Sequence, residues 1–313
     1  MLRSFVFLSN RAAKVFEKAF VPLGGVPYQN GVQNIDVLYY CTFGGKVKPA
    51  ANIGFDLVDR KLTVPLDHKA KFAKALQQSG LEVLKTYFSP RELPNDKQAL
   101  WFVKNPLAAG GKGIYCVRTE DVASVFKEGF IIQEAVTDVD LLNTRKYTLR
   151  VYVLYYQGSI YCFNDGLVVI HAKEYAEDDL DAETQYLHLG YDKEAGEVKL
   201  EKFSDHPHYG SLLGKIEQQV ADIFQIYLES LSQSADKAYC IFGVDVLVRR
   251  SLEPVIIEIN DRPNFVHNND INQNVNVPML QAMLGVFRPE VLTALKSPDL
   301  RFKQVLGSRG QIP

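Results

Sequence analysis

The sequence predicts an α+β fold built around antiparallel β-sheets, and three segments carry this prediction. The Val- and Ile-rich runs Ile241–Arg249 and Pro254–Asn260 flank a polar stretch, which is typical of a β-hairpin. The run 148–170 is strand-like and is interrupted by turn residues, which predicts a meander. Residues Leu212–Leu231 repeat apolar side chains at helical spacing, which predicts a long amphipathic helix.

Length and composition are those of an ordinary globular protein. The 313 residues are 47% hydrophobic and carry a formal net charge of -2, so they can bury a large core divided among two or three lobes. So small a net charge gives no general attraction to nucleic acid or to membranes. No apolar run approaches the length of a membrane span. We therefore expect no nucleic-acid partner and no membrane partner.

Cysteine usage and the first residues predict a cytoplasmic protein. The four cysteines, Cys41, Cys116, Cys162 and Cys240, have no CxxC spacing. Three of them lie in apolar, strand-like runs, where cysteine behaves as a small hydrophobic residue. This usage is typical of a reducing compartment. The apolar part of residues 1–8 is too short for a signal peptide, although its basic start keeps organelle targeting open.

The chain divides into three predicted lobes. Residues 1–60 form a small N-terminal αβ lobe, with a helix over Asn10–Phe20 and a strand over Ile35–Thr42. Residues 61–135 form a central lobe, whose expected elements are two helices and three strands: Leu66–Ser79, Asp121–Lys127, Trp101–Asn105, Ile114–Val117 and Ile131–Glu134. Residues 136–313 form a C-terminal lobe with the long helix, the hairpin and a meander of three strands: Thr148–Tyr156, Ser159–Phe163 and Leu167–Ile170.

The register of the hairpin decides which of its side chains share a face. Pairing of Arg249 with Pro254 would set that register, and Leu247 would then lie opposite Ile256. Two residues further from the turn, the same register opposes two carboxylates. Directly opposed side chains of antiparallel strands lie on one face.

Those opposed carboxylates, Asp245 and Glu258, are joined on the same face by Asn260. Carboxylate and amide oxygens without Cys or His select Mg²⁺ or Mn²⁺, and Mg²⁺ in such sites usually shares its ligands with substrate phosphates. The alternative is that both acids are solvated strand residues. We favour the metal site because opposed carboxylates repel each other unless a cation lies between them.

A glycine-rich loop, Gly110-Gly-Lys-Gly113, follows the strand that contains Lys104. Its glycines let backbone N–H groups approach an anion, and a lysine lies beside them. It is not a Walker A loop, because Pro106 stands at the first glycine position and Gly113 at the Ser/Thr position. Strands flank the loop on both sides, so we interpret it as a hairpin flap over a triphosphate; a plain turn is the alternative.

The motifs together resemble, in order and spacing, those of the tubulin–tyrosine ligase-like family of the ATP-grasp superfamily, over about residues 66–285. They are Trp101-Phe-Val-Lys-Asn-Pro with Gly110-Gly-Lys-Gly-Ile114, Gln133-Glu-Ala135, Arg145-Lys-Tyr-Thr-Leu-Arg-Val-Tyr-Val-Leu154, Phe242-Gly-Val-Asp-Val-Leu247 and Ile257-Glu-Ile-Asn-Asp-Arg-Pro263. The resemblance implies an ATP-grasp fold in which two lobes with antiparallel sheets clasp ATP. It also implies ATP-dependent ligation of a carboxylate to an amine through an acylphosphate.

The resemblance assigns roles to individual residues. Arg150 and Glu258 are expected to be catalytic, Arg150 by stabilising the transferred phosphate, and Asp245, Glu258 and Asn260 to bind Mg²⁺. Expected nucleotide contacts come from lysines, from the glycine loop and from backbone groups near the adenine: Lys69, Lys104, Lys146, Gly110, Gly111, Lys112, Gly113, Gln133, Glu134, Ala135 and Val136. Lys71 is a rival for the role of Lys69. The expected substrates are an amino-acid, peptide or protein carboxylate and an amine.

The chain also departs from the family pattern. The family usually has Asp at the position of Thr148 and Arg near Val169, and its His-Leu-Thr-Asn element appears only as His188-Leu-Gly-Tyr191. These positions belong to the acceptor and nucleotide sides of the site. A phosphotransferase that stops before ligation and a nucleotide-binding module without catalysis therefore remain alternatives.

Other polar segments have weaker functional readings. His171, His206 and His208 are expected to be surface residues, and His267 either touches the site or is a satisfied loop residue. The acidic stretch Glu174–Asp205 is interpreted as a solvated loop. Because it would repel a Glu-rich tail, we expect an acceptor other than an unmodified acidic tubulin tail. The positive excess in residues 1–100, with 14 Lys and Arg against 8 Asp and Glu, is the counter-argument.

Overall fold

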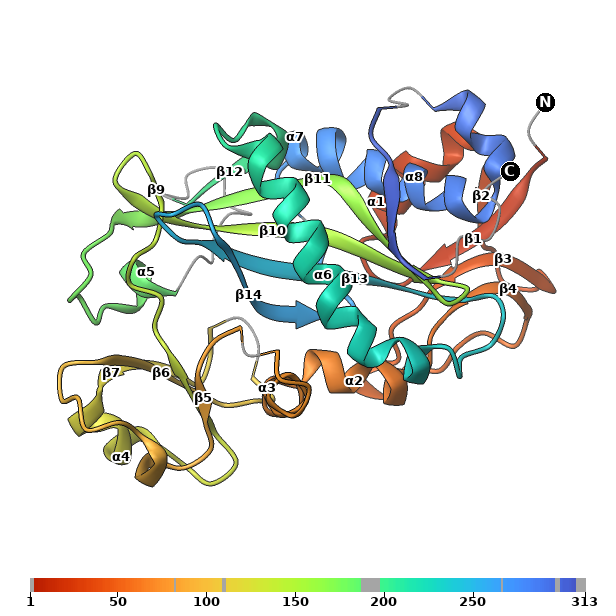
Figure 1. Ribbon diagram of the computed structural model, residues 1–313. Helices are drawn as coiled ribbons and strands as arrows, with labels where there is room; N and C mark the ends of the chain where they lie inside the picture. Colours follow the sequence, from red (N-terminus) through yellow and green to blue (C-terminus); the bar gives the residue numbers. More distant parts are fainter. Residues whose placement is uncertain are drawn as a thin grey trace.

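A computed structural model describes residues 3–81, 83–108, 111–186, 198–265, 267–295 and 299–307. It confirms the mixed α+β class. Over this part of the chain one sheet has 11 strands, in the main order β12-β11-β10-β13-β4-β3-β1-β2, and a separate sheet has 4 strands in the order β5-β8-β6-β7 (Figure 1). In Figure 1 the 4-stranded sheet and the helices α2 (Arg60–Asp67) and α3 (Lys69–Gln78) lie below the large sheet.

The N-terminal residues form a parallel sheet with one helix. Strands β1 (Phe5–Ser9), β2 (Gly25–Pro27), β3 (Asn34–Tyr39) and β4 (Asn52–Leu57) pair in parallel, and α1 (Ala13–Phe20) follows β1. Strand β4 also pairs in parallel with β13 (Ala238–Val248). The N-terminal sheet is therefore continuous with the large sheet, and the carboxyl end of β1 is held in a fixed relation to it.

The second sheet is antiparallel and carries one short helix, within the span predicted for the central lobe. Its elements are β5 (Thr86–Tyr87), β6 (Leu100–Lys104), β7 (Ile114–Arg118), α4 (Val122–Val125) and β8 (Ile131–Glu134). Trp101 and Val103 pack with α4 on one face. Alternation along β6 therefore turns Phe102 and Lys104 to the other face.

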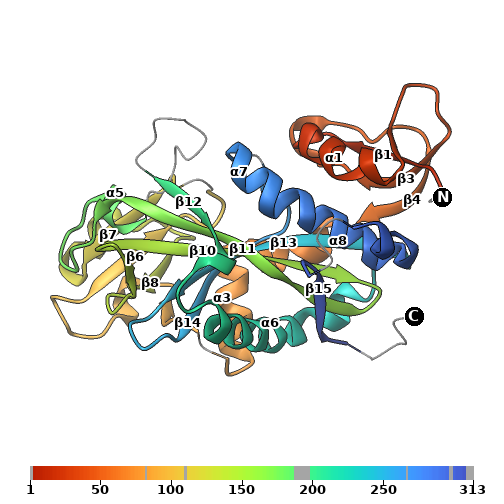
Figure 2. The same cartoon turned by 90° about the horizontal axis from the view of Figure 1, so that it is seen from above.

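The segment after residue 136 folds into the antiparallel part of the large sheet, between helices. Its remaining elements are β9 (Leu141–Leu142), β10 (Arg145–Tyr156), β11 (Ser159–Glu174), α5 (Ala182–Gln185), β12 (Lys199–Lys202), α6 (Tyr209–Leu231), β14 (Pro254–Asn260), α7 (Asn269–Ile271), α8 (Val277–Phe287) and β15 (Phe302–Leu306). Val151 and Val153 of β10 join a core with α6, whereas Tyr152 and Leu154 join a core with α8. Figure 2 shows the two helices on opposite sides of the sheet.

The predicted three-strand meander is wrong in one respect. Residues Ser159–Glu174 form one continuous strand, so Asn164-Asp165-Gly166 does not reverse the chain. Asp165 is buried and accepts hydrogen bonds from the backbone N–H of Ser204 and of Gly166. The turn-forming side chain thus makes a tertiary contact instead, and the extra residues are absorbed as a register shift against β10.

The predicted helix over Leu66–Ser79 is divided at His68. This residue has extended backbone angles, and its imidazole caps α3 by accepting from the N–H of Lys71. No helix among the described residues has both the length and the apolar character that a membrane span requires.

Candidate functional site

The opposed carboxylates are where the sequence predicts them, but the register that brings them together is irregular. Near the turn, Leu247 pairs with Val255 rather than with Ile256, because the pairing is shifted by one residue from the predicted one. A β-bulge between Asp245 and Val246 then restores the opposition of Asp245 and Glu258. Without that bulge Glu258 would lie opposite Val244, on the face that packs against α6.

Each carboxylate has a cationic partner. Arg150 lies opposite Asp245 across β10 and β13 and forms a two-pronged ion pair with it, including an Nη2 to Oδ2 contact of 2.8 Å. Lys69 Nζ lies 3.3 Å from Oε1 of Glu258 and donates to the carbonyl of Ala108 at 3.1 Å. Lys71, the rival of Lys69, is exposed on α3.

The predicted metal ligands are two carboxylates and one amide. Asn260 Nδ2 lies 3.4 Å from Oδ2 of Asp245, so the amide and the carboxylate are neighbours. Over the described chain no three or more His, Cys, Asp and Glu side chains are grouped to hold a metal ion. The set of two carboxylates and one amide carries oxygen ligands and fits Mg²⁺ or Mn²⁺. This assignment remains a prediction.

Two lysines approach from the other elements of the site. Lys104 donates to Gln133 Oε1 at 2.6 Å, and Lys146 is only 2% exposed. No carboxylate pairs with Lys146 in the described chain; its Nζ lies 5.7 Å from the ring centre of Phe102 and 5.5 Å from that of Tyr175. Burial lowers the pKa of each lysine to about 8. To remain charged while buried, a lysine without a carboxylate partner needs an anion from elsewhere.

These groups line one cavity of about 260 Å³. Of the predicted site residues, its lining includes Lys104, Gly111, Gln133, Glu134, Val136, Lys146, Arg150, Asp245, Glu258 and Asn260. Lys69 reaches the same group through Glu258. Lys112 is exposed and is not among the lining residues, and Gly110 lies outside the described residues. Sequence reasoning missed several further lining residues: Arg11, Ile114, His171, Gln185, Tyr186, Arg262 and Asn264.

The glycine loop is a hairpin connection between β6 and β7, as predicted. Gly111 and Gly113 have φ values of 74° and 64°, which favour glycine. Asn105 donates its backbone N–H to the carbonyl of Gly113 at 2.8 Å, which closes the base of the loop. The cavity wall therefore includes a backbone segment that few other residues could form.

The strand end over Gln133–Val136 connects the two sheets. The backbone N–H of Glu134 is donated to the carbonyl of Lys85, and that of Ala135 to the carbonyl of Leu100. These two N–H groups are therefore engaged within the protein. The side chain of Val136 is buried and lines the cavity.

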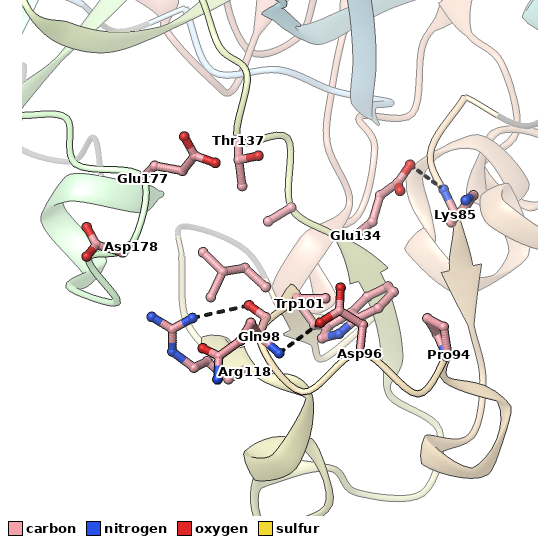
Figure 3. A pocket seen from close by; sticks show the side chains of 13 residues that line it. Lys85, Pro94, Asp96, Gln98, Trp101, Arg118, Glu134, Thr137, Glu177 and Asp178 are labelled. Atoms are coloured by element: carbon pink, nitrogen blue, oxygen red, sulfur yellow. Dashed lines mark hydrogen bonds between the residues drawn. The ribbon is translucent and has the colours of Figure 1, made fainter.

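A second cavity, of about 580 Å³, also borders this connection, through Glu134, Ala135 and Thr137 (Figure 3). Two of its charged side chains bond to the backbone: Glu134 accepts from the N–H of Lys85, and Arg118 donates to the carbonyl of Gln98. Glu177 and Asp178 of the acidic stretch face this cavity. The predicted site residues converge on the smaller cavity.

Two histidines predicted at the surface are buried. His171 is 1% exposed because β11 continues through it, and it lines the first cavity. His206 is 5% exposed and packs on Tyr147, with ring centres 5.1 Å apart. His208 is exposed, as predicted. His267 is buried and shares a hydrogen bond of 2.8 Å with Asn276, and burial lowers its pKa to about 3.

Two of the three departures from the family pattern are neighbours. Thr148 pairs directly with Val169 across β10 and β11, and both side chains are buried. The acid usual at the position of Thr148 and the base usual near Val169 are thus both replaced by neutral side chains, so neither position holds a buried charge. His188 and Tyr191 lie outside the described residues.

Comparison with known proteins gives a consistent result. The model of the family described as "Tubulin-tyrosine ligase family" matches residues 66–294. A probable alpha-tubulin polyglutamylase of Tetrahymena thermophila is 22% identical over 239 residues, and a probable tubulin polyglutamylase of Caenorhabditis elegans is 23% identical over 281 residues. The alignments cover 64% and 74% of this chain but only 56% and 65% of those relatives. A tubulin glycylase of Tetrahymena thermophila is 23% identical over 214 residues, which are 60% of this chain and 21% of that protein.

Proposed function

Because the chain belongs to the tubulin-tyrosine ligase family, we propose that it is an ATP-dependent ligase of the ATP-grasp type that forms an amide bond between a carboxylate and an amine. One observation carries this proposal most directly. Lys146 is buried without a carboxylate partner, in a cavity that also receives Lys104 from the other sheet and the Asp245–Arg150 pair. A bound polyphosphate would supply the missing negative charge.

The lining residues divide by the part of ATP they suit. Lys104 and Lys146 suit the phosphates, and the glycine loop suits close backbone approach to them. The buried side chain of Val136 suits the adenine. Asp245, Glu258 and Asn260 would hold Mg²⁺, which would neutralise phosphate charge when bound.

The chemistry needs no nucleophile from the protein. An oxygen of the substrate carboxylate attacks the γ-phosphorus, the bond to the ADP oxygen breaks, and an acylphosphate forms. The amine nitrogen then attacks the acyl carbon, inorganic phosphate leaves, and the amine loses a proton. Arg150 suits the charge that develops on the transferred phosphoryl group, since preorganised cations act most strongly in a water-excluded site.

The relatives guide the choice of substrates. Their names are those of tubulin polyglutamylases and a tubulin glycylase, so we propose a protein or peptide carboxylate and an amino acid as the two substrates. Tubulin is the first protein acceptor to test, against the expectation from the acidic stretch.

The test is incubation of the purified protein with ATP, Mg²⁺, a mixture of amino acids, and small peptides or tubulin. ADP release would be measured together with the mass of every acceptor. We expect ADP release coupled to a mass gain of one amino-acid residue. ADP release with a phosphorylated product and no amide would support the phosphotransferase, and nucleotide binding without turnover would support an inactive module.

A further inference from the structure

Arg11 is a cavity residue that none of the motifs includes. It follows the carboxyl end of β1 in the N-terminal sheet, whereas the other cations of the cavity come from β6, β10 and the segment after β14. Ligands of sheets with parallel strands bind beyond the carboxyl ends of those strands. In Figure 1 β1 lies at the right-hand end of the large sheet, whereas the 4-stranded sheet lies at the lower left.

The backbone around Arg11 is fixed by unusual local structure. The side chain of Asn10 donates to the carbonyl of Cys41 at 2.8 Å and accepts from its N–H at 2.9 Å. Ala12 adopts φ 58°, a left-handed conformation that a residue with a Cβ rarely adopts. Such strain persists only where the surroundings enforce it, and it is concentrated at functional sites.

Arg11 is joined to a second arginine of the cavity. Its Nη1 donates to the carbonyl of Arg262 at 2.5 Å, and Arg262 lies two residues beyond Asn260. Arg262 is 9% exposed and donates from Nη2 to the carbonyl of Val58. These bonds hold both side chains at the cavity wall next to the candidate metal residue.

The charge of the two arginines is poorly balanced. Arg11 forms no ion pair within the described residues, and the nearest carboxylate oxygen to Arg262 is that of Asp261, 3.6 Å from Nη1. Asp261 is itself shared, because its Oδ2 accepts from the Thr63 hydroxyl at 2.6 Å and lies 3.5 Å from Nε of Arg60. One more anionic group would therefore improve the charge balance of this region.

We propose, on the basis of the ligase function proposed above, that Arg11 and Arg262 bind the free α-carboxylate of the amino acid whose amine is joined. Guanidinium groups bind carboxylates through paired N–H···O bonds. A carboxylate held in this way has its lone pairs engaged and is a poor nucleophile, so the pair suits the carboxylate that does not react. The amine of the same molecule is left free to attack the acyl carbon.

The test compares amino acids with amines that lack only the α-carboxylate. Glutamate, glycine and tyrosine are titrated, beside γ-aminobutyrate, methylamine and tyramine, into the protein loaded with a non-hydrolysable ATP analogue and Mg²⁺. We expect at least one amino acid to bind more tightly than its partner amine. Arg11→Ala should weaken that binding by about 10- to 100-fold and leave the amines unaffected.

Two further variants separate charge from structure. Arg11→Lys keeps the charge but not the fork and should lie between Arg11→Ala and the wild type. Lys14→Ala removes an exposed charge three residues away and should change nothing. Affinity for the ATP analogue should be the same in all four proteins, which reports on folding and on nucleotide binding.

The proposal is overturned if no amino acid binds better than its decarboxylated partner, or if Arg11→Ala weakens both equally. Because binding is measured, this outcome is independent of turnover. Loss of analogue binding in the wild type would instead count against the proposed function. If turnover is observed, the same contrast should appear as a raised KM for the amino acid at an unchanged KM for ATP.

Discussion

Charge balance among single residues decides what the cavity can accept. Asp245 and Glu258 are matched by Arg150 and Lys69, whereas Lys146 has no carboxylate in the described chain. The unmatched positive charge is what a polyphosphate and a substrate carboxylate would neutralise. Three predictions follow at this scale.

Glu258→Gln should lower ATP turnover by about 100-fold or more, because it removes a charge expected to hold Mg²⁺ and the ion-pair partner of Lys69. The fold should survive, since the site is already polar. ADP release at saturating Mg²⁺ measures the effect. Glu253→Gln, at the exposed turn of the same hairpin, is the matched control. Near-normal turnover of Glu258→Gln would remove the metal assignment.

Lys104→Ala and Lys146→Ala should each raise the KM for ATP by about 10-fold, because each lysine is expected to bind phosphate in the ground state and in the transition state alike. Arg150→Ala should instead lower kcat, by about 100-fold. Steady-state kinetics over a range of ATP concentrations separate the two patterns. Equal effects from all three variants would show that Arg150 has been given the wrong role.

Nucleotide binding at about pH 8.5 should be accompanied by proton uptake. Burial lowers the pKa of Lys104 and of Lys146 to about 8, so both are largely neutral at this pH, and a bound polyphosphate raises their pKa again. For the free protein, the same lowering means that stability increases as the pH rises from about 8 toward 10.5, because the unfolded lysines then hold more protons.

Calorimetric titration in buffers of different ionisation enthalpy measures this uptake. The double variant with Met at both lysine positions should lose it, while Lys112→Ala, at an exposed position of the glycine loop, should keep it. Nucleotide binding with no proton exchange at that pH would contradict the prediction.

Irregularities in two strands position the chemical groups. The bulge between Asp245 and Val246 places Glu258 on the cavity face, and the shifted register of β11 brings Gly166 against β10. A Cβ on Gly166 would lie 2.3 Å from the backbone oxygen of Arg150, so this close approach requires glycine. The position of the strand that carries Arg150 therefore depends on Gly166, a residue without a side chain.

Gly166→Ala should destabilise the protein by about 1–3 kcal/mol and lower kcat, because the backbone next to Arg150 must shift. Gly214→Ala is the matched control. A Cβ at Gly214 meets nothing within 4 Å, and the residue lies on the exposed side of α6, so this change should stabilise by about 0.5–1 kcal/mol. Thermal unfolding and steady-state kinetics measure both. A Gly166→Ala protein as stable and active as the wild type would refute the role of the close approach.

At the scale of the whole molecule, one continuous sheet fixes three segments around the cavity. Strand β13 pairs with β10, with β14 and with β4, so the N-terminal sheet is tied to the strands that carry Arg150 and Glu258. The acidic stretch contributes Glu177 and Asp178 to the second cavity rather than to the first. These two acidic side chains therefore lie apart from the cations that line the first cavity.

Robust incorporation of glutamate or tyrosine into an unmodified tubulin tail is not expected. Residues 171–210 hold 11 acidic against 4 basic side chains and would repel such a tail. Mass spectrometry of tubulin tails after incubation with ATP, Mg²⁺ and either amino acid is the measurement, with a neutral peptide acceptor as the comparison. Efficient modification of the tail would reverse this prediction, would show that the basic excess of residues 1–100 guides the acceptor, and would leave the ligase chemistry intact.

The sequence alone determined the features that depend on local pattern. The α+β class, the hairpin, the hairpin connection at the glycine loop and the face shared by Asp245 and Glu258 all follow from alternation and turn chemistry, which act over a few residues. The predicted opposition of the two carboxylates is correct, but the predicted register near the turn is wrong by one residue. The bulge compensates for this difference.

Tertiary structure decided what local pattern does not encode. Asn164-Asp165-Gly166 has turn composition, yet Asp165 bonds to Ser204 and the strand continues. Arg11 reaches the cavity only because β4 pairs with β13, a contact between segments far apart in the chain. Burial of Lys146 likewise depends on both sheets. Long-range pairing and desolvation therefore set the site's charge, because neither has a signature within a short stretch of sequence.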